Sequence, residues 1–269
     1  DDGEFTVVES PSSPVAPGEQ TTLRIRFAPS SIGPKTAQLE IASNDPDEGD
    51  ERKISELIVE SEDFGEESIQ ELAAIGSREG AVPSVTDLQE IARDQGFSGN
   101  AAASVESLNE NDLPSYGHGL AWERGVKAAR ALRRRERLGD GPLDDERLSD
   151  MAGLPARAVG HGNDGYRFTY AIRANGADQR FVHRSRWATG RRFDVARLIG
   201  DRVAVQSNAG LRTATRVSTY RQQLQRAFAA EFLAPIDSVD TFLEGDYDED
   251  RQQEAADHFG VSPMMINSL

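Results

Sequence analysis

The chain has 269 residues, of which 37% are hydrophobic and 28% charged, and it contains no cysteine. Disulfide frameworks, cysteine-ligated metal sites and thiol nucleophiles are therefore excluded, and any metal site would have to use His, Asp or Glu. The length predicts two domains, and because no apolar run approaches the roughly 18 residues of a membrane helix, we expect no membrane span.

The formal net charge of −16 is unevenly distributed along the chain. Residues 1–114 carry 7 basic and 25 acidic side chains, residues 115–235 carry 22 and 12, and residues 236–269 carry 1 and 9. The basic middle block lacks interleaved aromatic residues, so it favours solvated, arginine-rich helix faces over a nucleic-acid surface. An acidic N-terminal part resting on a basic core is a third interpretation.

The first fifty residues alternate in the manner of β-strands. Leu23, Ile25 and Phe27 point one way and their polar neighbours the other, and residues 37–41 repeat the pattern after Pro-Gly and Gly-Pro turn signals. This predicts half of a β-sandwich, which we assign to a domain spanning residues 1–60.

The string VAPGEQTTLRIRFAPSSIGPKTAQLEIASNDPDE carries a PGE, strand, F-x-P and SNDP series within residues 5–48. It resembles the choice-of-anchor D and Hydin-like immunoglobulin-like domains. The resemblance implies a partial immunoglobulin-like sandwich that binds or spaces and carries out no chemistry. The strands that normally precede this string are missing, and only ERKISELIVE could supply the last one.

Residues 61–117 are predicted to be an acidic helical connector and linker. IQELAAIGSREG and VTDLQEIARDQG have helical spacing, and Ser84 is a predicted N-cap of the second helix. The stretch from Ser98 to Gly119, rich in Ser, Asn, Gly and Asp, predicts a linker.

Residues 118–269 predict a mainly helical domain with a small antiparallel sheet, which makes the chain α+β. LAWERGVKAARALRRRERLG is a predicted helix with Trp122 and Leu132 on its apolar stripe, and we expect Trp122 in the core. Two alternating segments around Asn175-Gly176 predict a β-hairpin.

The stretch RRFDVARLIGDRV at residues 191–203 follows this hairpin. It resembles the helix RRF-x-x-A-H-E-x-x-H of the ImmA/IrrE zinc-peptidase group. Downstream, STYRQQLQRAFAAEFLAP is similar to that group's second helix, and DRQQEAADHFGVSPMMINSL to its closing helical pair. The resemblance covers about residues 118–269 and implies a zincin-like scaffold.

The zinc chemistry of that group needs two histidines at i and i+4 and an intervening Glu as general base. These positions hold Arg197, Leu198 and Asp201, and the third-ligand position falls on Gln222 or Leu224. None is the residue that the motif needs. The sequence therefore predicts a degenerate site with no catalytic residue, no metal and no cofactor.

The replacements predict a helix that folds without a metal crosslink. We expect Arg197 and Asp201 to form an ion pair in place of the metal, and Gly200 to permit a close backbone approach. Leu198 is expected to join an apolar stripe with Val195, Ile199 and Val203.

The second helix has its own predicted features. Thr219 and Gln222 have the spacing of a capping box, and Tyr220, Leu224, Phe228 and Phe232 share one face that ends at Pro235. Glu231 is expected to be solvated or salt-bridged.

An alternative metal site is weakly indicated. The histidines, His118, His161, His183 and His258, are scattered and form no pair at metal-ligand spacing. No serine-nucleophile motif is present. An active zinc endopeptidase with non-standard ligands, which would use His161, His183 and Asp201, stays as an alternative.

The leading hypothesis is a catalytically degenerate peptidase-like protein that acts as a binding or regulatory module, most simply on a protein or peptide. DNA binding is a further alternative, because EAADHFGVSPMMINSL has a helix-turn-helix form with Ser262 as N-cap and Pro263 next, although residues 236–269 are acidic. A surface or scaffold role through the immunoglobulin-like segment is another. The peptidase-like region favours the cytoplasm, and the sandwich an extracellular place.

Overall fold

The computed structural model divides into two units, Asp1–Arg52 and Lys53–Leu269, and each is described by itself. The residues that the structure describes are 5–9, 24–27, 64–79, 84–109, 111, 113–116, 119–161, 166–174, 176–205 and 209–268.

The first unit contains the antiparallel pair β1 (Phe5–Glu9) and β2 (Arg24–Phe27). Phe5 pairs with Phe27 and Val7 with Ile25 in the register of the two strands. The pair agrees with the strand predicted around Ile25. The strands expected at residues 37–41 and in ERKISELIVE lie outside the described residues.

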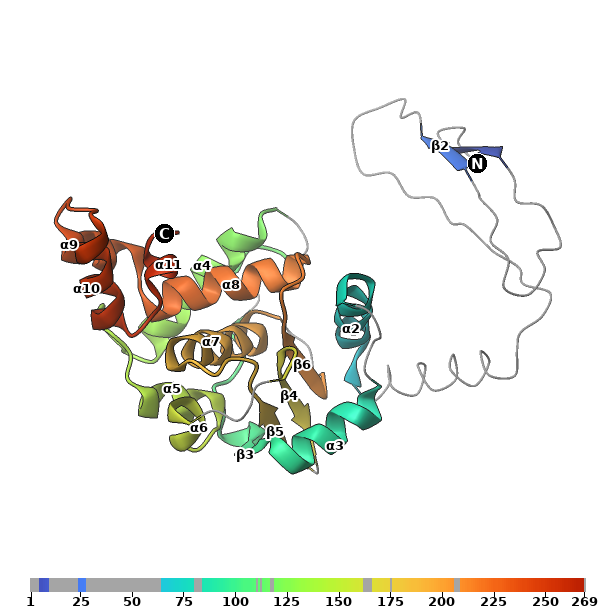
Figure 1. Ribbon diagram of the computed structural model, residues 1–269, viewed down its shortest axis with the longest axis horizontal. Helices are drawn as coiled ribbons and strands as arrows, with labels where there is room; N and C mark the ends of the chain where they lie inside the picture. The colour runs from blue at the N-terminus through green and yellow to red at the C-terminus, as the bar shows by residue number, and fades with distance from the viewer. Residues whose placement is uncertain are drawn as a thin grey trace. The chain divides into compact units, whose positions relative to one another are not determined.

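The second unit is built on a four-stranded antiparallel sheet in the order β3-β5-β4-β6 (Figure 1). Its strands are β3 (Phe97–Asn100), β4 (Thr169–Arg173), β5 (Asp178–Val182) and β6 (Leu211–Ala214). The predicted hairpin is confirmed, because β4 and β5 pair with Arg173 opposite Gln179. Mixed helix and sheet confirm the α+β class.

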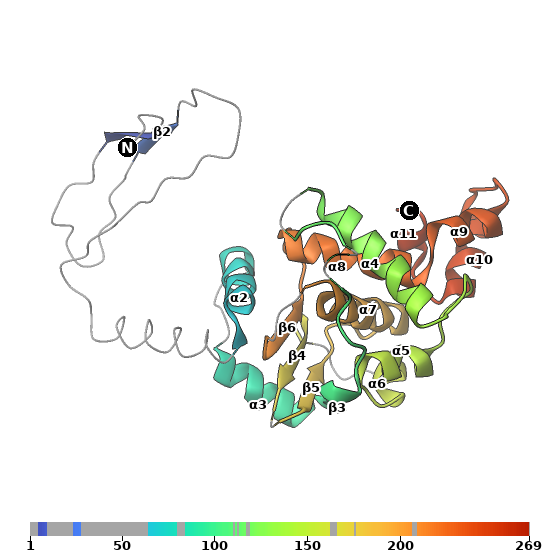
Figure 2. The same ribbon diagram turned by 180° about the vertical axis from the view of Figure 1, so that it is seen from behind.

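Both faces of this sheet are covered by helices. Helices α2 (Glu66–Glu79) and α3 (Val85–Gln95) pack on one face, against Tyr170, Ile172 and Val182. The alternate residues Ala171 and Phe181 belong to the second core on the other face, which contains α7 (Ala188–Ala204). Figure 2 shows the sheet between α3 and α7 from behind. The strict two-residue period of strands produces this division.

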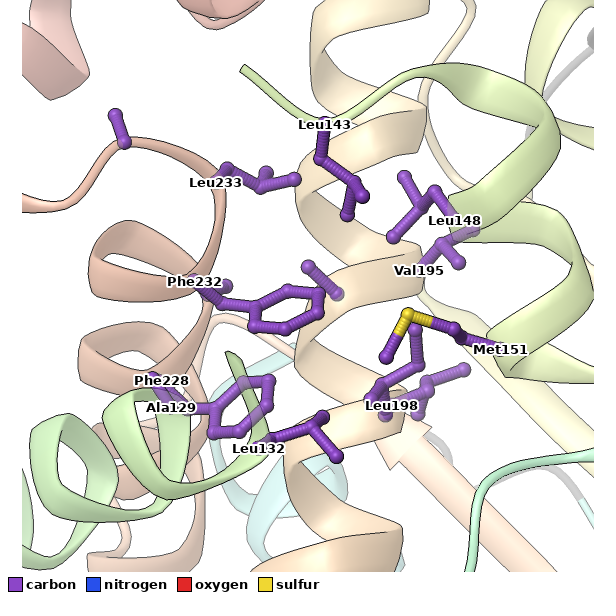
Figure 3. Close-up of a cluster of buried hydrophobic side chains, with 14 of the residues drawn as sticks. Ala129, Leu132, Leu143, Leu148, Met151, Val195, Leu198, Phe228, Phe232 and Leu233 are labelled. Carbon is purple, nitrogen blue, oxygen red and sulfur yellow. The ribbon is translucent and has the colours of Figure 1, made fainter. Parts of the chain in front are cut away.

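The remaining helices build that second core. They are α4 (Ala121–Arg135), α5 (Asp145–Ala152), α6 (Arg157–Gly160), α8 (Tyr220–Leu233), α9 (Ile236–Leu243), α10 (Glu249–Phe259) and α11 (Pro263–Ile266), with a short 3-10 turn at Ala101–Ala103. In Figure 3, Leu132 of α4, Met151 of α5, Val195 and Leu198 of α7, and Phe228 and Phe232 of α8 converge on one apolar cluster.

Two glycines allow the central helices to approach closely. A Cβ on Gly125 of α4 would lie 2.5 Å from the carbonyl oxygen of Leu224, and one on Gly200 of α7 would lie 2.6 Å from the Phe228 ring. Real side chains do not tolerate such contacts, so α8 is seated against α4 and α7 at positions where neither has a side chain. The close approach predicted for Gly200 is confirmed.

Local signals at helix ends agree with the structure. Ser84 caps α3 in a capping box with Asp87. Ser262 caps α11, with Pro263 at the first helical position, after the left-handed Gly260 that ends α10. Pro235 follows the end of α8, as expected.

Two expectations for the middle of the chain are wrong. The predicted linker after Phe97 begins with strand β3, and further along it Leu108 and Leu113 are buried in the core. The polar composition of this stretch gave no strand signal, because a short edge strand can be held by backbone hydrogen bonds alone. Leu108 and Leu113 are isolated apolar residues within it and show no periodic pattern. Trp122 is 54% exposed, since α4 buries the neighbouring face that carries Ala121, Gly125 and Leu132.

The arginines of the middle block are divided between the surface, as expected, and the interior. Arg124, Arg133, Arg191, Arg192, Arg197 and Arg221 are all buried. Arg124 donates to the carbonyl of Ala204, Arg133 to that of Phe232, and Arg191 to that of Val159. These guanidiniums satisfy carbonyl groups at helix ends, which would otherwise be left without partners. Six arginines of the block therefore stabilise the interior.

Among the residues that the structure describes, no helix is long and apolar enough to cross a membrane.

Candidate functional site

The degenerate motif positions lie in the interior, on the stretch of α7 that faces α8 and β6. Arg197 is 3% exposed, Leu198 4% and Asp201 0%. Leu198 belongs to the apolar core together with Val195, Ile199 and Val203, which confirms the predicted stripe. Arg197 and Asp201 face the polar residues of α8.

Asp201 is held by three side chains from outside its own helix. Arg221 of α8 donates to both carboxylate oxygens, from Nε to Oδ1 at 2.5 Å and from Nη2 to Oδ2 at 2.6 Å. Gln225 donates to Oδ1 at 2.9 Å and Arg212 of β6 to Oδ2 at 3.2 Å. Burial alone would raise the pKa of Asp201, but the attraction of Arg221 and Arg212 and these hydrogen bonds lower it to about 2.

Arg197 has a separate set of partners. Its Nη2 donates to Gln222 Oε1 at 2.5 Å and to the carbonyl oxygen of Thr215 at 2.6 Å, and its Nη1 lies 3.4 Å from Asp194 Oδ1. Burial lowers the pKa of Arg197 to about 10, although Asp194 opposes this effect. The expected ion pair between Arg197 and Asp201 is therefore wrong, because each group finds a partner across the helix interface.

Asp194 anchors the other end of this arrangement. Its carboxylate accepts a hydrogen bond from Thr169 Oγ1 at 2.9 Å and lies 3.3 Å from the guanidinium of Arg184. Thr169 opens strand β4, so Asp194 connects α7 to the sheet. Asp194 occupies the first unspecified position of the RRF-x-x-A pattern. The only sequence signal for its role is that it is a charged residue next to the apolar residues of this helix.

Gln222 joins the two halves of the network. Its Oε1 accepts from Arg197 and from the backbone N–H of Thr215 at 2.8 Å, and its Nε2 donates to the carbonyl oxygen of Thr213 at 3.0 Å. Thr219 caps α8 through the N–H of Gln222, as predicted. The Gln222 side chain belongs to the buried network, so the capping-box role expected for it is wrong.

Leu224, the other third-ligand position, is buried in the apolar core with Phe228 and Phe232. The predicted apolar face of α8 is thus confirmed for these three residues, and Tyr220 packs at its edge. The polar face of α8 toward α7 presents Arg221, Gln222 and Gln225. Among those residues no carboxylate is present. Glu231 is buried and paired with Arg130 at 2.6 Å.

Helix α2 adds one more carboxylate from the far side of β6. Thr219 Oγ1 donates to Glu71 Oε1 at 2.6 Å. Burial raises the pKa of Glu71 above its usual value despite this hydrogen bond. Nothing in the sequence distinguishes Glu71 from the other acidic residues of α2, so its place beside Thr219 was not predicted.

Several buried polar atoms of this region have no hydrogen-bond partner within the described part of the chain. They are Glu71 Oε2, Arg197 Nε, Thr213 Oγ1, Tyr220 Oη, Arg221 Nη1 and Gln225 Oε1. Most are donors or neutral oxygens rather than the imidazole and carboxylate ligands that zinc takes.

The residues present do not fit a zinc ion. A catalytic zinc needs three protein ligands, whereas Arg197 is a cation, Leu198 has no donor atom and both oxygens of Asp201 are bound by guanidiniums. Within the described ranges, no group of three His, Asp or Glu side chains could hold a metal. We therefore derive no chemical step through a metal.

The histidines lie apart. His183 is buried after β5, its Nε2 lies 2.7 Å from the carbonyl oxygen of Ala158, and burial lowers its pKa to about 4. His161 is exposed at the end of α6, and His258 stacks on Phe242 at 4.8 Å. His118 lies outside the described residues. The residues of the alternative ligand set, His161, His183 and Asp201, therefore lie on different elements and form no common site.

The helix-turn-helix form predicted near the C-terminus is short in the structure. Helix α11 covers four residues, and its Met265 and Ile266 are buried. A recognition helix presents several residues to the major groove, and α11 offers one turn.

No family model matches the chain, and no curated protein matches it.

Proposed function

We propose that the region from about residue 118 to 269 is a catalytically degenerate relative of the ImmA/IrrE zinc-peptidase group that acts as a binding or regulatory module. The observation that carries the proposal is the bidentate pair of Asp201 with Arg221. Asp201 stands where the motif would place its second histidine. Its carboxylate is committed to a guanidinium and cannot donate to a metal at the same time.

The order of the elements supports the same proposal. A β-hairpin leads into α7, and α8 packs against α7 with its FAAE sequence close to the helix end. The two helices that would carry zinc ligands are present and adjacent. Their facing side chains, Arg197, Asp201, Arg221 and Gln222, form a hydrogen-bonded network that joins the helices without a metal. A scaffold that has lost its catalytic groups can still bind a partner, because one fold can host several unrelated functions.

The partner proposed for the module is a protein or peptide. Residues 236–269 carry 9 acidic side chains and one basic one, and a surface of this charge repels the phosphate backbone of nucleic acids. Six of the arginines that make the middle block basic are buried, and Arg124, Arg133 and Arg191 among them donate to carbonyl groups. The number of arginines in the sequence therefore overstates the positive charge of the surface that DNA would meet.

The test is the metal content of the purified chain, measured by plasma mass spectrometry after exchange into zinc-containing and then zinc-free buffer. We expect less than about 0.1 zinc per chain, for both the wild type and Asp201→Ala, because three converging ligands are required. Cleavage of casein is measured alongside, with and without EDTA. Stoichiometric zinc that Asp201→Ala removes, together with EDTA-sensitive cleavage, would overturn the proposal in favour of a peptidase with non-standard ligands.

A further inference from the structure

A groove of about 840 Å³ is lined by residues from the C-terminal end of α4 and from α9 and α10. Arg130, Arg134 and Arg137 line one side of it. Phe242 and His258 also line it, and their rings are stacked with centroids 4.8 Å apart. The groove therefore combines guanidinium groups with an aromatic surface.

The arginines of the groove differ in what they bind. Arg133 is buried and donates to the carbonyls of Gly139, Gly141 and Phe232, and Arg130 is paired with Glu231. Arg134 and Arg137 are exposed, and within the described part of the chain neither guanidinium has a hydrogen bond or ion pair. Two arginines are thus available to a ligand, next to two that hold the groove in shape.

The backbone at Arg137 is unusual. Its φ is 55°, in the left-handed region that glycine normally supplies just after a helix, because a Cβ is disfavoured there. The chain has a glycine with φ 64° two residues later, at Gly139. The N–H of Leu138 donates to the carbonyl of Arg133, so Arg137 stands just after the end of α4 and its left-handed backbone turns the chain out of the helix.

We infer that this groove binds an acidic peptide segment of a partner protein. The inference rests on the proposed function and names its binding site. The planar guanidiniums of Arg134 and Arg137 match carboxylates, which they bind through two parallel hydrogen bonds. The ring of Phe242 lies between His258 and the guanidinium of Arg251, so the exposed ring of His258 and the edge of Phe242 form the aromatic surface open to a neighbouring side chain of the peptide.

The charges around the groove favour a peptide over a nucleic acid. Asp140 and Asp237 also line it, so the arginines form a narrow basic strip beside acidic groups. A peptide can place one or two carboxylates on this strip and keep the rest of its chain neutral. A nucleic acid carries a phosphate at every nucleotide and would bring several of them against the carboxylates.

The test is fluorescence anisotropy with the full chain and a fluorescein-labelled ten-residue peptide that carries two Glu residues, each followed by Phe, among Gly and Ser residues. A matched peptide with Gln in place of every Glu is the ligand control. We expect the Glu peptide to bind about tenfold or more tightly than the Gln peptide, and its affinity to fall as the salt concentration rises from about 0.05 to about 0.3 M.

Variants of the chain separate the groove from the fold. Arg134→Glu with Arg137→Glu is expected to weaken binding about tenfold or more, because attraction becomes repulsion. Arg137→Gly removes the guanidinium but suits the left-handed backbone, so it should weaken binding while the unfolding temperature does not fall. Arg93→Gln removes an arginine that is exposed on α3, far along the sequence from α4, and should change the affinity less than about twofold.

Three results would overturn the inference. They are no binding of the Glu peptide at up to about 1 mM chain, binding that the double charge reversal leaves unchanged, and tight binding of a labelled DNA duplex that the same variants abolish. The second result would exclude the groove as the binding site, while the chain would still be a peptide-binding module. Zinc-dependent cleavage would overturn the proposed function alone, since the anisotropy comparison does not depend on catalysis.

Discussion

Asp201 of α7 and Arg221 of α8 form a buried bidentate ion pair, with N to O distances of 2.5 and 2.6 Å and exposures of 0% and 3%. The pair joins the two helices at the point where the resembled motif would place a metal ligand. A buried ion pair adds little net stability over an apolar contact, but removal of one partner leaves an uncompensated charge. We therefore regard the pair as fixing how α7 and α8 meet.

The substitution Asp201→Asn keeps the shape of the side chain and removes its charge. Arg221 and Arg212 then lose their common counterion, and we expect the free energy of unfolding to fall by about 3–5 kcal/mol. Urea unfolding followed by circular dichroism measures the loss. Asp94→Asn, which removes half of an exposed pair with Arg93, should stay within about 0.5 kcal/mol. A similar small change for Asp201→Asn would contradict the role assigned to the pair.

The same residue predicts how stability depends on acid. The pKa of Asp201 is lowered from 3.8 to about 2 in the folded chain, so its contribution is complete above about pH 4 and is lost as the pH falls toward 2. The loss amounts to about 2 kcal/mol. Urea unfolding at pH values between 5 and 2 should show this slope in the wild type and a weaker one in Asp201→Asn. Equal slopes in the two chains would show that other carboxylates dominate this window.

His183 predicts a second pH window at higher values. Its Nε2–H donates to Ala158, while Nδ1 has no partner within the described residues, so protonation would bury a charge without an acceptor. The folded pKa of about 4 lies below the unfolded value of 6.5, and the unfolded chain therefore takes up a proton first as the pH falls. Stability should decrease by about 3 kcal/mol between pH 6.5 and 4.

The variant His183→Gln tests this assignment. Its amide can still donate to the carbonyl of Ala158, but it does not titrate. Asp194 and Arg191 are charged groups near His183, and both remain in the variant. We expect the variant to be less stable at pH 7 and to show little change between pH 6.5 and 4. A wild-type slope in the variant would assign the window to other groups.

Much of the fold was predictable because its signals are local. The helices α2, α3, α4, α7 and α8, the hairpin of β4 and β5, and the caps at Ser84, Thr219 and Ser262 depend on spacing and on side chains within four residues. Strand β3 was missed, because its pairing with β5 joins residues about eighty positions apart. The position of Trp122 was wrongly predicted, because the helical period shows which residues share a face but not which part of that face packs against neighbouring helices.

The candidate site was predicted in its positions and mispredicted in its contacts. The sequence predicts Arg197 and Asp201 one turn apart on one helix and Leu198 on its apolar stripe, but it does not predict that the two charged residues are buried. The partners of Arg197 and Asp201 come from α8 and β6, and the choice between an intrahelical pair and these partners depends on which groups the tertiary fold brings near. Arg221 and Gln225 stand one helical turn apart on a polar strip of α8, and that strip was the available signal.

Gln222 offers a matched comparison with its neighbour. Gln222→Ala would leave the N–H of Thr215 without its buried acceptor, and it would remove one of the hydrogen bonds of Arg197 and one of the two that the Thr213 carbonyl accepts. We expect a loss of about 2–4 kcal/mol. Gln223 is exposed and donates only to the carbonyl of Ser218, so Gln223→Ala should cost less than about 0.5 kcal/mol. Equal effects of the two substitutions, measured by urea unfolding, would place Gln222 outside the network.

The contact of Gly200 with Phe228 makes the last prediction. Alanine is favoured over glycine in a helix by about 1 kcal/mol, so an uncrowded site would gain stability from Gly200→Ala. Here the new methyl group would meet the Phe228 ring at 2.6 Å, and overpacking costs about 1–3 kcal/mol. We therefore expect a net loss, and a smaller loss when Gly200→Ala is made in a Phe228→Leu background, because the shorter side chain leaves room. A double-mutant cycle from urea unfolding measures this coupling, and strictly additive effects would contradict the close packing of α7 on α8.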